Sequence, residues 1–149
     1  MTETLVDLEE RILIVADMRT LFSHPRAPQA SAGELLDIGE KVLEAWIVAR
    51  DEAPTKVLKE GFRLLALHRQ GAKGEPSFNA CRETCRELVY HYNLIADEPD
   101  HPDTARRLKM MSLVAKHLLL FVAGKLEVAG LGEFCCAAKP VREGDGNRQ

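Results

Sequence analysis

Residues 108–131 read LKMMSLVAKHLLLFVAGKLEVAGL, and this stretch decides the fold. At helical spacing its apolar residues form two seams. The first seam consists of Leu108, Met111, Ala115, Leu118 and Val122, and the second consists of Met110, Val114, His117, Phe121 and Val128. The narrow polar stripe between them holds Lys109, Ser112, Lys116 and Glu127, and it is interrupted by Leu120 and Ala123. A helix with two apolar sides needs neighbours on both, so we predict that it is the central element of an all-α bundle.

The composition is typical of one globular domain. The chain has 149 residues, of which 46% are hydrophobic and 29% are charged, and its net charge is −3. A chain of this length buries roughly 68–70% of its unfolded surface, which is enough for a self-sufficient core. Basic and acidic residues are spread over both halves, so the sequence predicts no nucleic-acid partner.

The sequence predicts neither a secretory signal nor a membrane-spanning helix. Residues 1–10 are acidic and lack a cleavable apolar core, so we expect no secretory signal. Residues 113–132 are long enough to cross a bilayer, but they are interrupted by Lys116, His117, Lys125 and Glu127. Each central charge costs about 2.5–3.5 kcal/mol on insertion. We therefore predict a cytoplasmic protein that has free thiols and no membrane contact.

Turn residues divide the chain into about five predicted helices. The first opens at the Thr4–Asp7 capping pair and should extend to Phe22. The second is expected to begin at the Ser31–Glu34 capping box, and the third to span Thr55–Gln70. The fourth should span Ser77–Ala96, and the fifth should follow a cap at Asp100 or Asp103. The buried side of the third should hold Leu58, Phe62 and Leu65. We predict one compact helical-bundle domain over residues 1–132, with a long, largely buried last helix, and a flexible C-terminal tail over residues 133–149.

Three glycines, Gly39, Gly61 and Gly124, fall inside predicted helices. Each costs about 0.5–1 kcal/mol relative to alanine. Close approach of two helices would offset this cost, and we favour that interpretation. The alternative is a small apolar ligand pocket near Trp46, Phe62 and Phe121.

Cys81 and Cys85 lie one helical turn apart on an apolar stripe. We predict that they pack inside as small hydrophobic residues and bind no metal. The alternative is a helical enzyme or thiol-redox protein that uses this pair, with His91 as a further candidate. Cys135 and Cys136 are adjacent in the predicted tail, and their spacing suits a zinc site poorly.

Histidines and phosphate-binding motifs suggest no catalytic centre. Glu87 and His91 share a helix side, which a metal site could use, but a solvated charge pair is the favoured interpretation. The spacing E-x-x-H occurs at Glu98–His101, within the proline-containing turn, so the chain lacks the paired helical E-x-x-H motifs of di-iron bundles. It also lacks a Walker A, a G-x-G-x-x-G and a G-x-S-x-G motif. The sequence therefore predicts no cofactor and no metal.

These features favour a non-catalytic helical module that acts through protein–protein contacts. Leu120 interrupts the polar stripe of the last helix, and with Leu119 and Phe121 it forms an apolar patch of the kind that marks contact surfaces. We predict a homodimer that uses these three residues, because a twofold dimer is the commonest closed assembly.

Overall fold

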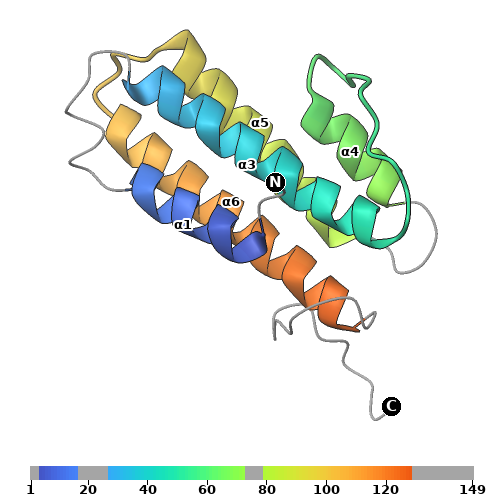
Figure 1. Ribbon diagram of the computed structural model, residues 1–149. Coiled ribbons are helices and arrows are strands. Elements are labelled where there is room, and N and C mark those ends of the chain that lie inside the picture. Colours follow the sequence, from blue (N-terminus) through green and yellow to red (C-terminus); the bar gives the residue numbers. More distant parts are fainter. Residues whose placement is uncertain (1–3, 17–26, 73–78, 129–149) are drawn as a thin grey trace.

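The computed structural model describes residues 4–16, 27–72 and 79–128. Over these residues it is all-α (Figure 1). The helices are α1 (Leu5–Ala16), α3 (Ala27–Ala49), α4 (Arg63–Gly71), α5 (Asn79–Asp97) and α6 (Thr104–Val128). Within the described ranges β-type pairing is confined to an isolated bridge between Lys59 and Phe62. The predicted all-α class and the long last helix are confirmed.

The helices α1, α3, α5 and α6 form a bundle in which successive members run in opposite directions (Figure 1). The central pair is α3 and α6, which pack against each other and each contact both α1 and α5. The short helix α4 lies beside one end of the bundle, where it packs against α3 and α5. The domain boundary predicted at residue 132 lies outside the described residues.

The interior of the bundle contains the first predicted seam of α6. Its members Leu108, Met111, Ala115, Leu118 and Val122 are all buried in one core cluster. Ser112, which we placed on the polar stripe, is buried as well, so that prediction is wrong. Its hydroxyl donates a hydrogen bond of 3.0 Å to the carbonyl oxygen of Leu108, and this bond satisfies the hydroxyl inside the core.

Two helix starts were predicted correctly. At α1, the Asp7 amide donates to the Thr4 hydroxyl (3.1 Å) and the Thr4 amide donates to the Asp7 carboxylate (3.0 Å). These bonds lower the pKa of Asp7. At α6, the carbonyl of Asp103 accepts the amide of Arg107 at 2.8 Å, which places Asp103 at the N-cap. Residues 17–22, over which α1 was predicted to continue, lie outside the described residues.

The start of α3 was not predicted correctly. The helix begins at Ala27, so Ser31 lies buried inside it and caps nothing. Pro28 is compatible with this earlier start, because a proline in the first turn lacks an amide that would have no helical partner anyway. Glu34 pairs with Arg11 of α1 instead, at 2.7 Å.

The predicted helix over residues 55–70 is shorter in the structure, because α4 begins at Arg63. Glu60 and Gly61 have φ angles of 55° and 86°, and two successive left-handed residues cannot continue a right-handed helix. Leu58 therefore lies in a loop and is 64% exposed, although we predicted that it is buried. Gly61 is a turn residue and not a helical glycine.

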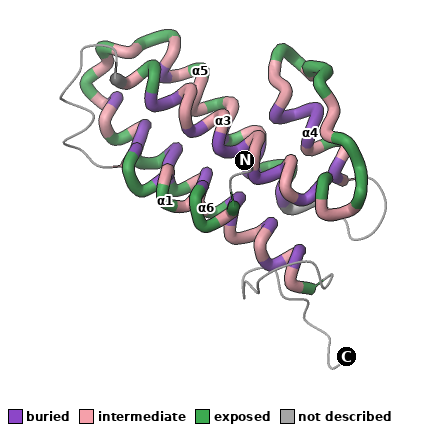
Figure 2. Tube along the Cα trace, viewed as in Figure 1, coloured by how far each residue is buried: buried purple, intermediate pink, exposed green. Residues whose placement is uncertain are grey.

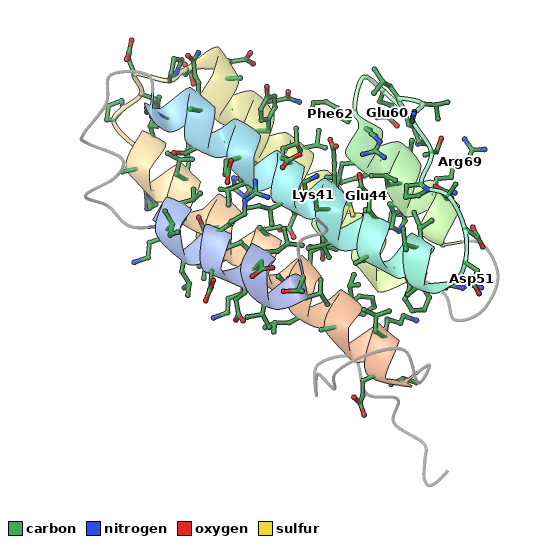
Figure 3. All side chains as sticks on the ribbon, in the orientation of Figure 1. Lys41, Glu44, Asp51, Glu60, Phe62 and Arg69 are labelled. Carbon is green, nitrogen blue, oxygen red and sulfur yellow. The ribbon has the colours of Figure 1, made fainter. Side chains whose placement is uncertain are left out.

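Polar contacts hold this loop and α4 against α3. Arg63 forms ion pairs with Glu44, which lies on the side of α3 that faces α4 (Figure 3), and with Glu40 at 3.5 Å. Its Nε donates to the Thr55 carbonyl at 2.8 Å, and the Gln70 side chain binds the Thr55 amide at 2.8 Å. Burial raises the pKa of Glu40, and Arg63 opposes this effect.

Gly39 is the helical glycine at which the close-packing interpretation is supported. A Cβ atom there would lie 3.0 Å from Leu88 Cδ1, 3.2 Å from Leu64 Cδ1 and 3.7 Å from Leu118 Cδ2. Three helices therefore meet α3 at this point. Gly124 lies within α6 and is buried. None of the described helices is long and apolar enough to cross a membrane.

Candidate functional site

The outer side of α6 carries apolar side chains that the described residues leave uncovered. We call Met110, Leu113, His117 and Leu120 the outer stripe; their spacing of three and four residues places them along one side of the helix. Met110 is 47% and Leu113 is 55% exposed, His117 is exposed, and Leu120 is half-buried. The alternation of three and four residues is also the spacing of a seam that packs against a partner helix.

The neighbouring helix α1 adds exposed apolar groups of its own. Leu8, Ile12 and Val15 face the core, whereas Leu13 and Ile14 are exposed. Figure 2 shows exposed residues along the solvent side of α1, next to α6. Isolated exposed apolar residues are normal, but their presence on two helices in contact enlarges the surface available to a partner.

The three predicted interface residues have different environments. Leu119 is 3% exposed and belongs to the core, so it is not part of the outer stripe. Leu120 and Phe121 are half-buried and pack against the edge of the core. The Phe121 ring also lies 5.7 Å from Lys125 Nζ. In the second predicted seam, Met110, His117 and Val128 are exposed, so this side of α6 is not covered as we expected.

Leu113 is the residue that the sequence reasoning missed. We assigned it to neither apolar seam, yet it is the most exposed leucine of α6. Leu113 lies three residues after Met110 and four residues before His117, and this helical spacing is the signal that could have identified it.

Cys81 and Cys85 are buried free thiols on α5, and the prediction that they pack inside is confirmed. A hydrogen bond with Cys85, together with burial, raises the pKa of Cys81 well above its usual range. The thiol and not the nucleophilic thiolate is therefore the stable form at neutral pH. Cys135 and Cys136 lie outside the described residues.

His91 is half-buried on α5, and its Nδ1 has no hydrogen-bond partner among the described residues. Burial lowers the pKa of His91, and the charge of Arg107 acts in the same direction. Glu87 has the opposite effect through its charge. Nowhere in the described ranges do three metal-ligating side chains gather, so the Glu87–His91 pair has no third ligand there.

The three aromatic residues proposed to line a pocket make separate contacts. Trp46 is fully buried, and its Nε1 donates to the Gly71 carbonyl at 3.2 Å, which ties α3 to α4. Phe62 packs edge-to-face against Tyr92, with 5.9 Å between ring centroids. Phe121 lies against Lys125 on α6.

We take the outer stripe as the candidate site, because its apolar side chains lie at helical spacing on the side of α6 that faces away from the core. Comparison with known proteins adds no further assignment: the chain matches no family model, no curated protein and no solved structure.

Proposed function

We propose that this protein is a non-catalytic helical module that self-associates through the outer stripe of α6. The observation that carries the proposal is the exposure of Met110 and Leu113, at 47% and 55%, on a helix whose other side is fully buried. Removing apolar surface from water stabilises an association by roughly 25 cal/mol per Å².

The spacing of the outer stripe favours another helix as the partner. Side chains at steps of three and four residues interlock with those of a second helix that lies at a small angle. A second copy of α6 presents the same spacing, and a twofold axis would bring the two stripes together. His117, in the middle of the stripe, adds a polar group that favours one register over others.

The thiol-redox alternative is weaker, because both thiols of α5 are buried and the pKa of Cys81 is raised. The apolar-pocket alternative has less support, because Trp46 is fully buried and its Nε1 is already bonded to the Gly71 carbonyl. The cytoplasmic setting remains part of the proposal and rests on the free thiols of Cys81 and Cys85.

Two matched leucine variants test the proposal. Leu113→Glu places a charge within the outer stripe, and Leu58→Glu places the same charge on an exposed leucine of the loop before α4. Light scattering coupled to size-exclusion chromatography should show dimers for the native chain and for Leu58→Glu, and monomers for Leu113→Glu. Circular dichroism should show equal helix content in all three. Equal masses for the two variants would contradict the assignment of the interface to α6.

A further inference from the structure

A hollow of about 360 Å³ lies between α4 and α5, and none of its lining residues belongs to the outer stripe. Its lining includes four cationic side chains, which are Lys59, Arg69, Arg82 and Arg86. His68 also lines it, and Leu65 and Ala72 supply an apolar part. Small-molecule sites commonly have volumes of about 300–1,000 Å³ and combine an apolar lining with a few polar groups. The hollow has the size and the mixed lining of such a site.

The charges around the hollow are only partly balanced. Glu60 pairs with Lys59 Nζ at 3.1 Å and with Arg86 Nη2 at 2.9 Å, so one carboxylate is shared between two cations. Within the described ranges, Arg69 and Arg82 form no ion pair or hydrogen bond. Figure 3 shows Glu60 and Arg69 on the α4 side of the molecule. Among the described residues, the cationic side chains that line this hollow therefore outnumber the carboxylates that pair with them, although the whole chain has a net charge of −3.

The arginines belong to two different helices. Arg82 and Arg86 are one turn apart on α5 and lie on the same side of it, while Arg69 approaches from α4. The planar guanidinium group donates two parallel hydrogen bonds to a phosphate, and this geometry is why arginine recurs at phosphate sites. The sequence alone did not identify this cluster, because Arg69 and Arg82 belong to different helices.

We propose that the hollow between α4 and α5 binds a small molecule in which a phosphate group is attached to an apolar group. Arg69 and Arg82 bind the phosphate, Arg86 and Lys59 add positive charge beside it, and Leu65 and Ala72 contact the apolar part. A compact hollow suits a small ligand, whereas a nucleic acid would need a basic surface that extends along the molecule.

Isothermal titration calorimetry at constant ionic strength, with phenyl phosphate and with inorganic phosphate as probes, tests this proposal. We expect saturable binding of one phenyl phosphate per chain at submillimolar concentration, and weaker binding of inorganic phosphate, which lacks the apolar group. Equal binding of the two probes would mean that the apolar lining plays no part. Absence of saturation by both at millimolar concentration would overturn the proposal.

Variants locate the binding to the hollow. Arg69→Ala and Arg82→Ala should each weaken phenyl phosphate binding about tenfold, because each removes a charged donor of hydrogen bonds to the phosphate. Arg106→Ala is the matched control, since Arg106 is an exposed arginine of α6 that pairs with Asp103 at 3.4 Å. Unchanged binding in the two hollow variants, or an equal loss in the control, would contradict the proposed site. Neither Arg69 nor Arg82 is buried, so both hollow variants should fold.

Discussion

The helices α4 and α6 both pack through buried leucines, but they differ in length, in position and in the polar contacts that they make. The 25 residues of α6 lie at the centre, where Leu108, Leu118 and their neighbours are fully buried. The 9 residues of α4 lie at the edge, where Leu64 and Leu67 are fully buried and the contacts of Arg63 and Trp46 add polar links between α4 and α3. Apolar burial is non-directional, whereas polar contacts depend on the exact geometry of the partners. We therefore expect α6 to unfold with the whole domain and α4 to respond to changes in single polar groups.

The largest expected effect is that of a truncation on the inner side of α6. Leu118→Ala removes a fully buried side chain next to Gly39, and such a change costs about 2–5 kcal/mol because it leaves a cavity. Urea denaturation followed by circular dichroism measures the loss. A loss below about 1 kcal/mol, of the size typical of surface positions, would mean that α6 is not the centre of the core.

The second effect concerns the polar contacts of α4. Arg63→Met keeps the aliphatic stem but removes the ion pairs with Glu40 and Glu44 and the hydrogen bond to the Thr55 carbonyl. We expect a loss of about 1–3 kcal/mol, because two acidic side chains lose their shared partner. Amide hydrogen exchange should become faster in α4 than in α6. Equal acceleration in both helices would show that α4 is not a separate unit.

A smaller effect is expected when exposed leucines are changed. At concentrations where the chain is monomeric, Leu113→Glu and Leu58→Glu should each alter the free energy of unfolding by about 0.5 kcal/mol or less, since both side chains face solvent. Chemical denaturation of dilute samples provides the comparison with Leu118→Ala. A large loss for Leu113→Glu would show that Leu113 supports the monomer fold, and the outer stripe would then not be a free surface.

The smallest effect is a pH dependence at the loop before α4. The side chains of Arg86 and Lys59 lower the pKa of Glu60 to about 2, from 4.5. Because the pKa of Glu60 is lower in the folded state, its carboxylate stabilises the fold at pH values above the unfolded-state pKa of 4.5. This contribution is lost as the pH falls from 4.5 to about 2. Glu60 is exposed, and Lys59 and Arg86 are only half-buried, so the contribution is small. Glu60→Gln should therefore be slightly less stable than the native chain at pH 6.

The control for this prediction is the same comparison in acid. Close to the folded-state pKa of about 2, the native carboxyl is about half protonated and the stability difference between the two chains should shrink. A difference that is equal at both pH values would show that the ion pair with Arg86 does not cause it. Other carboxylates titrate equally in both chains and cancel in the difference.

The contrast between the two helices also explains what the sequence could predict. The buried seam of α6 was predicted correctly, because a 3.6-residue period repeated over a long segment is a strong signal. The start of α4 was missed, because it depends on the left-handed φ angles of Glu60 and Gly61. The loop before α4 contains Leu58 and Phe62, and its sequence pattern therefore resembles that of a helix with an apolar side.

The candidate surfaces were predictable to different extents. The outer stripe was partly predicted, because Leu120 was recognised as an apolar residue on the polar stripe of α6. Which of the two apolar seams is covered in the monomer depends on where α1 and α5 pack. The exposure of Met110 and Leu113 follows from that packing. The hollow between α4 and α5 joins Arg69 to Arg82 across helices, and a period read along one helix contains no information on such a contact.

The most direct test of self-association through α6 is sedimentation equilibrium of the native chain over a range of concentrations. We expect an average mass that rises with concentration towards twice 16.6 kDa. The association constant should change little with salt, because the outer stripe is mostly apolar. A mass that stays at 16.6 kDa up to tens of micromolar would contradict self-association through α6.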